Sequence, residues 1–340
     1  MKKTLTILLF PALMFSASAQ ISLNNLFTSE ASGTLCQPGV VNKSPGKGAS
    51  FTYSLNPDFK MTVPDAENAS KIERSERFDS KLKLPLINAP GFKFMLGFQY
   101  TLEKYHFSDI DPENAPLFSR LNNAELKTTG VAAYIVHPIN EKIYTSFRFG
   151  ASWHGDYSTF ISLDNRFAIY RAAALIGIKK RDNLEYGIGL LFIKSFRRTS
   201  ILPFGFYNQT FNEHWGIEMV LPVSIKGRYN FNEHSMALFG AEYSSQDYAL
   251  KVPQPSMNPF LPQPLKAPFH YHRSSIDLTT SFYQRLTSWT WVELKAGYAF
   301  SLSSKAKDIP LNQTFDLKPS SGMVGMVSLF LSPPKNCMEH

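Results

Sequence analysis

The chain has 340 residues, a formal net charge of +8 and 44% hydrophobic residues. Beyond its N-terminus no stretch reaches the ~18 apolar residues that a membrane-spanning helix needs, so we expect no helical membrane span. Aromatic residues make up 14% of the chain, and a transmembrane β-barrel uses aromatic residues in the girdles at its two membrane interfaces.

The N-terminus has the pattern of an export signal. Two lysines and an apolar run precede Ala17-Ser18-Ala19, which supplies the small-residue cleavage pattern. We therefore expect a signal peptide over residues 1–19 and a mature chain that begins at Gln20, without the cysteine of a lipoprotein. Export also excludes nucleic acid as a partner.

Residues 20–48 are polar and rich in glycine and serine. A segment of this composition cannot bury enough apolar surface to fold by itself. We expect either a periplasmic N-terminal segment or a small plug inside a barrel.

Most of the remaining chain alternates apolar and polar residues. From Phe92 to Leu102 every second residue is apolar, and the residues between them, such as Lys93 and Gln99, are mostly polar or small. A period of two predicts strands with one apolar and one polar face. We predict an all-β fold, a transmembrane antiparallel up-and-down β-barrel over residues 49–331, with fourteen strands at 49–55, 74–87, 92–105, 125–137, 143–154, 167–179, 184–197, 200–210, 215–220, 223–231, 236–249, 271–285, 290–303 and 319–331.

The lengths of the connections support this count. Short connections follow every even-numbered strand, and most of the others are long, as expected for short periplasmic turns and long extracellular loops. Leu221-Pro222 is the weakest point, because two short strands must turn back there; without that hairpin the barrel has twelve strands. A secreted β-sandwich fits the long alternating strands poorly.

Two segments outside the strands remain open to alternatives. The 250–270 loop carries six prolines, which favour extended backbone, and it either folds over the barrel mouth or stays a solvated surface loop. Cys36 precedes the first strand and Cys337 lies in the C-terminal tail, 332–340. Barrel closure brings both ends to one side, so these cysteines either form a disulfide or remain free thiols.

The central block from 201 to 243 resembles a known family. Leu202-Pro203-Phe204-Gly205-Phe206-Tyr207, Phe211-Asn212-Glu213-His214-Trp215-Gly216 and Gly240-Ala241-Glu242-Tyr243 are similar to an outer-membrane β-barrel family of Gram-negative bacteria, catalogued as a domain of unknown function. The resemblance implies the barrel and a location in the outer membrane. It implies no substrate or catalytic residue.

Few residue groups suggest enzyme chemistry. His154, Asp156 and Ser158 have the residue types of nucleophilic catalysis, but no serine motif accompanies them. His270 and His272 could begin a metal site, yet no cysteine or carboxylate cluster completes it. We predict no catalytic, cofactor or metal site, and a protein that is not an enzyme.

The polar strand faces carry an excess of five positive charges. Asp79, Glu103, Glu185, Glu242, Asp277 and Glu293 are the expected inward carboxylates. The expected inward basic residues are Arg77, Lys81, Lys83, Lys93, Arg148, Arg171, Lys179, Lys226, Arg228, Arg285 and Lys295. A basic lumen concentrates anions, whereas the same charges paired across the interior would only stabilise the barrel.

We therefore expect a monomeric outer-membrane protein that acts as a passive channel or transporter for small polar or anionic solutes. A non-conducting structural or surface-interaction barrel is the alternative, and a lipid-modifying enzyme is the third reading. The expected partners are outer-membrane lipid, lipopolysaccharide, the outer-membrane assembly machinery and a small anionic solute. No cofactor is expected.

Overall fold

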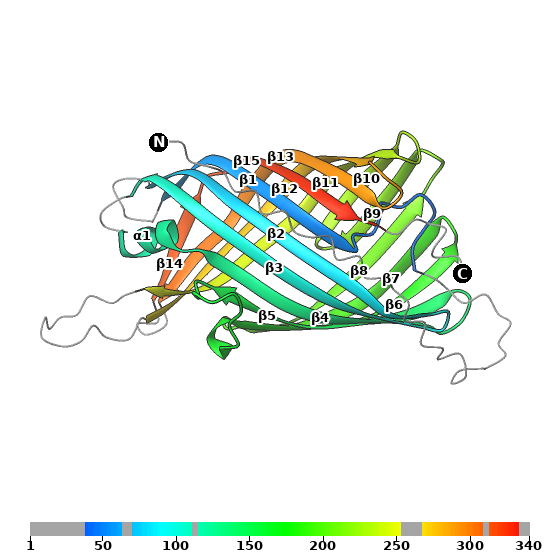
Figure 1. Ribbon diagram of the computed structural model, residues 1–340, viewed down its shortest axis with the longest axis horizontal. Coiled ribbons are helices and arrows are strands. Elements are labelled where there is room, and N and C mark those ends of the chain that lie inside the picture. The colour runs from blue at the N-terminus through cyan, green and yellow to red at the C-terminus, as the bar shows by residue number, and fades with distance from the viewer. Residues whose placement is uncertain (1–37, 63–69, 111–114, 253–266, 309–312, 333–340) are drawn as a thin grey trace, which may run out of the picture. The chain divides into compact units, whose positions relative to one another are not determined.

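The alternating segments form the strands of one antiparallel sheet that closes on itself (Figure 1). The computed structural model describes residues 38–62, 70–110, 115–252, 267–308 and 313–332. The expected signal peptide, both cysteines and most of the proline-rich loop and C-terminal tail lie outside the described residues. The elements are β1 (Ala49–Thr62), β2 (Ser70–Ala89), β3 (Phe92–Asp109), α1 (Ala115–Asn123), β4 (Leu126–Pro138), β5 (Ile143–Gly155), η2 (Asn165–Phe167), β6 (Ala168–Arg181), β7 (Leu184–Lys194), β8 (Thr199–Thr210), β9 (Trp215–Leu221), β10 (Ser224–Asn230), β11 (Ser235–Val252), β12 (Ala267–Arg285), β13 (Thr290–Asp308), β14 (Gln313–Pro319) and β15 (Gly322–Leu331).

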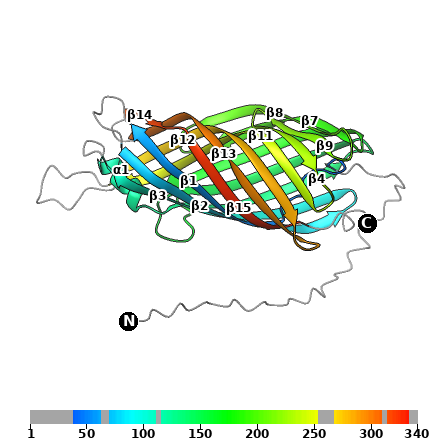
Figure 2. The ribbon, with the colours of Figure 1, turned by 90° about the horizontal axis from the view of Figure 1, so that it is seen from above.

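Each strand from β1 to β13 pairs with the next one along the chain, and β1 closes the barrel. β14 and β15 both pair with β1 and with β13, so together they occupy one position in the wall (Figure 2). The predicted fourteen-strand barrel is confirmed. The twelve-strand alternative is wrong, because β9 and β10 pair as a hairpin around Leu221-Pro222.

The two ends of the barrel differ in their connections. At the turn end all six connections are short, namely 90–91, 139–142, 182–183, 211–214, 231–234 and 286–289. The loop end is the opposite end, where α1 and η2 lie. Asn140, Asn212 and Asn232 accept hydrogen bonds from the backbone two or three residues later, which explains why asparagine recurs in these turns.

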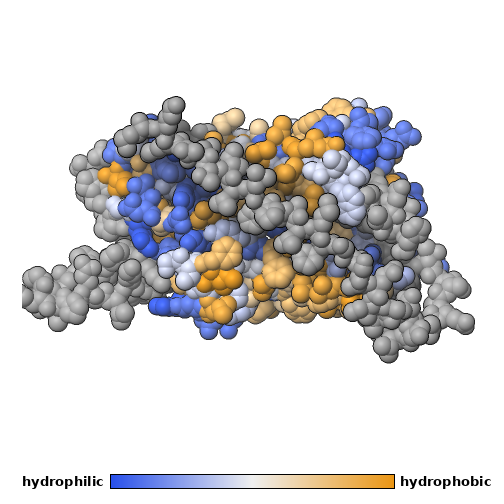
Figure 3. All heavy atoms as spheres, in the orientation of Figure 1, coloured by the Kyte–Doolittle hydropathy of each residue, from blue (hydrophilic) through white to orange (hydrophobic). Residues whose placement is uncertain are grey.

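The outer face of the barrel is apolar over the middle of the strands. Large side chains such as Phe98, Ile188 and Leu294 point outward and are exposed, with Leu294 at 54%. Figure 3 shows such hydrophobic residues gathered in the middle of one face and hydrophilic residues toward the ends. Polar side chains such as Thr101 and Glu293 are buried inside. The alternation in the sequence therefore separates an apolar exterior from a polar interior.

Several strands run farther than predicted at the loop end. β1 continues to Thr62, β11 to Val252 and β13 to Asp308, through residues that we had assigned to loops. Beyond the apolar belt the outer face also becomes polar, as at Lys305, so the alternation that reveals a strand disappears. The ladder of backbone hydrogen bonds nevertheless continues. No helix among the described residues is long and apolar enough to cross a membrane.

An apolar cluster fills the loop end of the barrel interior. The segment 106–124, predicted as a loop, contains the end of β3 and the helix α1, which contacts β3 and also β11 across the barrel. Phe118 and Leu121 of α1 are buried with Tyr105, Tyr248 and others. The cluster comprises Phe59, Met61, Ile72, Tyr105, Phe118, Leu121, Ala124, Leu126, Tyr248, Leu250, Tyr271, Ala306 and Leu317.

Candidate functional site

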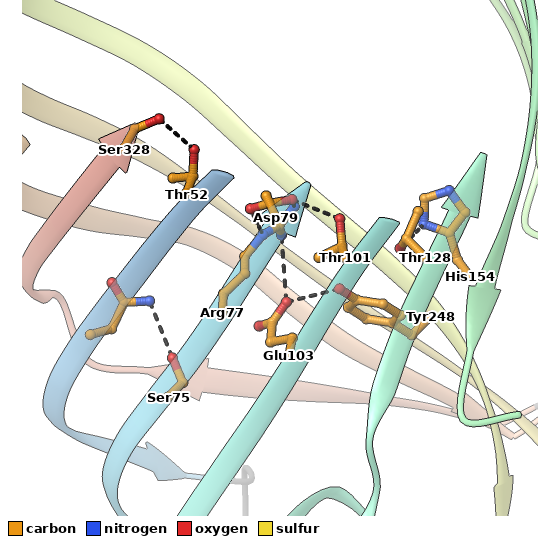
Figure 4. A network of polar contacts seen from close by, with 11 residues as sticks. Thr52, Ser75, Arg77, Asp79, Thr101, Glu103, Thr128, His154, Tyr248 and Ser328 are labelled. Carbon is orange, nitrogen blue, oxygen red and sulfur yellow. Dashed lines mark hydrogen bonds and ion pairs between the residues drawn. The ribbon is translucent and has the colours of Figure 1, made fainter. Parts of the chain in front are cut away.

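On the turn-end side of this apolar cluster, one charged network lies on the inner wall of β2, β3 and β11. The Arg77 guanidinium donates to Asp79 at 2.8 Å and 3.1 Å, and it lies 3.5 Å from Glu103 (Figure 4). Thr101 donates to Asp79 at 2.6 Å, and the Tyr248 hydroxyl donates to Glu103 at 2.8 Å. These carboxylates each have several donors, which compensates their burial. The Arg77 charge is therefore balanced within the wall.

The inner wall of β9, β10 and β11 is paired in the same way. Glu242 forms ion pairs with Lys226, at 2.6 Å, and with Lys295. The Arg228 guanidinium is fully buried and donates to Glu218 at 2.8 Å and to Thr210 at 2.7 Å. These three predicted lumen cations, on β10 and β13, are neutralised by carboxylates on β9 and β11.

Gly216 makes room for that guanidinium. A Cβ at Gly216 would lie 2.4 Å from Nη2 of Arg228, which is too close for two heavy atoms that are not bonded. Only glycine therefore fits on β9 beneath the Arg228 side chain.

The remaining turn-end cations do not form a binding site. Lys179 lies 3.4 Å from Asp182 in the β6–β7 turn, and Arg285 contacts His234 and lies over the Trp291 ring. Lys93 shares the inward face of β3 with Gly97 by strand alternation. It makes no ion pair with any carboxylate that the structure describes.

Four predicted cations instead gather on β2, β5 and β6 without a direct ion pair. Lys81, Lys83, Arg148 and Arg171, here called the basic wall, line one recess of about 60 Å³. No carboxylate of the described residues lies within 4.0 Å of any of these four side chains. Lys83 and Arg148 lie over the Tyr134 ring, at 5.5 Å and 5.2 Å from its centroid, and Arg171 donates to Ser152 at 2.9 Å.

Small residues keep this recess open. Gly97, Gly130, Ala132 and Gly150 line it between the cations. A Cβ at Gly97 would lie 2.8 Å from the Tyr134 ring, so glycine there lets the ring lie flat against β3. The basic wall is therefore an accessible group of donors rather than a packed polar core.

The segment 38–48 lies across the turn end of the interior. Its backbone N–H groups at Gly39 and Ser44 donate to Glu185 and Glu218, at 2.8 Å and 2.9 Å, and the Ser44 hydroxyl donates to Glu218 at 2.6 Å. Lys47 forms an ion pair with Glu293. The segment thus binds carboxylates of β7, β9 and β13, three strands spread around the barrel.

Two residues of this segment have left-handed backbone. Gly39 has φ of 111° and Asn42 has φ of 56°, and these are the two residue types that adopt such values most readily. The resulting bends let the backbone meet Thr210, which donates to the Val41 carbonyl at 2.6 Å. The composition of 20–48 predicted a segment without its own core, and apart from one backbone hydrogen bond between Lys43 and Val40 the hydrogen-bond partners of 38–48 come from the barrel.

A second cavity, of about 250 Å³, crosses the barrel wall between β8 and β11. Its lining includes inward residues such as His154, Arg171 and Gln246, together with Tyr243, Ser245 and other residues of the outer face of β11. One cavity can reach both faces of a strand only around an unpaired edge. The sequence analysis did not predict this cavity. The short strands predicted over 215–220 and 223–231 were the feature that could have indicated an interruption in the wall.

The strand pairing shows where that edge lies. β9 and β10 have seven residues each, and pairing stops at Gly205 with Leu221 and at Ser224 with Glu242. Beyond these pairs, residues 199–204 of β8 and 244–248 of β11 have no strand partner on their facing edges among the described residues. We call this interruption the β8–β11 window.

The residues considered for catalysis or metal binding do not assemble. His154 contacts Ser152 at 2.7 Å and Thr128 at 3.1 Å, whereas Asp156 pairs with Arg120. His154 thus shares no hydrogen bond with Asp156.

The second histidine group is also dispersed. His272 lies 2.9 Å from Asp247, while His270 lies against the Phe196 ring, at 4.6 Å between centroids. The described parts of the chain contain no cluster of three metal-ligating side chains. Cys36 and Cys337 lie outside them, so their pairing stays a prediction.

The comparisons with known proteins place the chain in a family and give distant structural likenesses. A model of the family described as "Domain of unknown function (DUF6268)" matches residues 104–332, well over half of the chain. No curated protein matches the chain.

Among solved structures, the chain is similar to a Pseudomonas aeruginosa FadL homologue, at 9% identity and a TM-score of 0.40, over 84% of this chain and 90% of that one. It is also similar to the toluene transporter TodX of P. putida, at 9% identity and a TM-score of 0.33, over 85% and 90%. The outer membrane protease OmpT of Escherichia coli matches at 9% identity and a TM-score of 0.27, over 86% and 100%. Likenesses this low carry no argument about function.

Proposed function

We propose that this chain, which belongs to the DUF6268 family, is a monomeric outer-membrane channel or transporter for small anionic solutes. The basic wall carries this proposal. Four cations share a recess without a direct ion pair to a described carboxylate, whereas Arg77, Lys226, Arg228 and Lys295 all have one. Fixed positive charge on a low-dielectric wall raises the local concentration of anions.

The apolar middle of the outer face, here called the outer belt, supports a location in the outer membrane. Antiparallel strands satisfy the backbone groups wherever neighbouring strands pair, and the exposed side chains of Phe98, Ile188 and Leu294 match a hydrocarbon environment rather than water. On this proposal the outer belt contacts outer-membrane lipid, the loop end meets lipopolysaccharide, and the turn end faces the periplasm. The outer-membrane assembly machinery inserts the barrel.

We further propose that residues 38–48 form a periplasmic plug. The segment spans the turn end through Glu185, Glu218 and Glu293, and such contacts can be weakened without touching the outer belt. Passive flow would then depend on how often the segment leaves these carboxylates.

Single-channel recording in planar bilayers tests the plug. Glu218→Gln with Glu293→Gln should increase the frequency or size of conductance steps, because two anchors of the segment become neutral. Glu242→Gln is the matched control, since it removes a half-buried inward carboxylate whose ion pairs among the described residues are with Lys226 and Lys295 and not with the segment. Equal effects of the control and the double variant would contradict the plug.

Reversal potentials in a salt gradient test the solute class. Lys81→Glu with Lys83→Glu changes the fixed charge by −4 inside the recess and should shift selectivity from anions toward cations. The preference should weaken at high salt, because screening acts over about 8 Å at physiological ionic strength. Lys142→Glu with Lys180→Glu makes the same charge change at exposed turn-end positions and should shift it far less. A wild-type pore that prefers cations would refute the proposal.

A non-conducting structural or surface-interaction barrel is the second candidate. The apolar cluster at the loop end favours it, because α1 and inward side chains of eight strands fill the interior there. Silence of folded wild-type protein and of the plug variant alike would support this candidate. We propose no enzyme activity, since His154 and Asp156 have separate partners.

A further inference from the structure

We propose that the β8–β11 window is a lateral binding site for a single-chain anionic amphiphile, which enters the barrel interior from the membrane. This inference rests on the proposed outer-membrane location and deepens the proposed function by naming the solute class and its route. It begins with the backbone. Unpaired strand edges are not tolerated against lipid hydrocarbon, but they are tolerated where they line a hydrated cavity.

The two axial routes into the interior are obstructed among the described residues. The apolar cluster with α1 fills the loop end, and residues 38–48 cross the turn end. The 250 Å³ cavity lies between these obstructions and reaches the outer face through the wall. The window is therefore the least obstructed way into the basic interior.

The window lies at the upper edge of the apolar belt. On the β8 side, Ile201 is 67% exposed on the outer face and pairs with outward-facing Phe192. On the β11 side, exposed Tyr243 pairs with exposed Ile276, and the next outward positions are Ser245 and Asp247. This change from apolar to polar marks the depth at which lipid headgroups meet hydrocarbon chains.

The lining combines apolar groups with cations. Ile193, Leu202 and Tyr243 line the cavity beside the window, and four arginines also line it. Arg77 and Arg197 are paired with carboxylates, whereas Arg171 and Arg198 have no ion pair among the described residues. A neutral hydrocarbon would not compensate Arg171 and Arg198, and a purely polar anion would not cover the apolar residues. A ligand with an anionic head and an apolar chain matches both.

The cavity size limits the ligand to one chain. Pockets that enclose drug-sized molecules have about 300–1,000 Å³, so 250 Å³ accepts a head and the start of one chain, with the rest of the chain in the membrane. Arg171 lines both this cavity and the recess of the basic wall. An anionic head bound at Arg171 would thus stand at the entrance to that recess.

The window has a bridge on its loop-end side. Arg197, in the β7–β8 turn, donates to Asp247 on the outer face of β11 at 2.6 Å, and His272 lies 2.9 Å from the same carboxylate oxygen. Phe196 packs on His270 of β12. The β7–β8 turn therefore reaches over the outer side of β11 and fixes the width of the window.

Photolabelling with a diazirine-bearing palmitic acid tests the proposal in lipid nanodiscs. Label mapped by mass spectrometry should concentrate on 193–202 and 243–248, and unlabelled palmitate should compete for it. Ser200→Trp should reduce the label at least tenfold by filling the window, and Ser245→Trp on the opposite edge serves as a second variant. Ser146→Trp, on the inner face of β5 outside both cavity linings, should leave it unchanged. Heat-modifiable gel mobility establishes that each variant is folded.

The head group is tested separately. Arg171→Gln should weaken competition by palmitate about tenfold and leave competition by methyl palmitate unchanged. Label spread evenly over the outer belt and insensitive to both tryptophan variants would mean annular lipid only, and would overturn the proposal. Anion-selective conductance without saturable label would overturn the window while the proposed function stands. If photolabelling of the window is saturable but planar bilayers show no conductance, the result would support the window and refute free conduction of ions through the barrel.

Discussion

Arg228→Met should destabilise the barrel by about 3–5 kcal/mol, because it leaves a carboxylate inside the wall without its cation. The guanidinium is 0% exposed and loses two charge-assisted hydrogen bonds, to Glu218 and Thr210, each worth about 1.5–3 kcal/mol. Two features reduce the cost. Nε of Arg228 has no hydrogen-bond partner among the described residues, and Glu218 keeps both donors of Ser44. We therefore expect a value near the lower limit.

The assay is an equilibrium urea titration of folding into lipid vesicles, followed by tryptophan fluorescence and gel mobility. Arg166→Met is the matched control, because its guanidinium is 65% exposed and its ion pair with Asp164 should contribute about 0–1 kcal/mol. Glu218→Gln with Arg228→Met should cost less than the two single changes added together, since the pair is in direct contact. A loss for Arg228→Met no larger than that for Arg166→Met would refute the reasoning.

Three further outcomes follow from the faces of the strands. Leu294→Arg, inside the apolar belt of the outer face, should reduce the free energy of folding into vesicles by about 2–4 kcal/mol, whereas Leu302→Arg near the edge of the belt should cost about 0–1 kcal/mol. Equal costs would contradict the assigned depth. Gly216→Ala should destabilise the barrel in the same titration, because its Cβ would lie 2.4 Å from the buried guanidinium, and an unchanged midpoint would be evidence against that contact. Epitope tags at Asn183, in a turn, should be inaccessible to antibody on intact cells, and tags at Ser162, in a loop-end connection, should be labelled; the opposite result would reverse the orientation.

The local pattern of the sequence was sufficient for the strands and their faces. Side-chain direction in a strand alternates with a fixed period, so Phe98 and Leu294 could be assigned to the exterior without knowing any neighbour. The turns were also visible, because asparagine side chains satisfy the backbone of the same turn at Asn140, Asn212 and Asn232. Where the outer face turns polar, as at Lys305, this local signal ended and the strand limits were predicted too short.

Only the tertiary structure decided which charges remain available. Strand alternation put Lys81 and Lys226 on the same inner face, but Lys226 forms an ion pair with Glu242 of the next strand, while Lys81 forms none, because nearby Asp79 pairs with Arg77. That difference depends on the register between strands, which the composition of one strand does not contain.

The closure of the turn end and the window were likewise beyond the sequence. Ser44 and Glu218 are 174 positions apart, and Lys47 and Glu293 are 246 apart, so no local pattern could pair them. The window exists because β9 and β10 end before their neighbours do, which leaves an edge of β11 unpaired. An alternating sequence specifies the faces of each strand, but the partner at each edge depends on the lengths of all strands in the closed sheet.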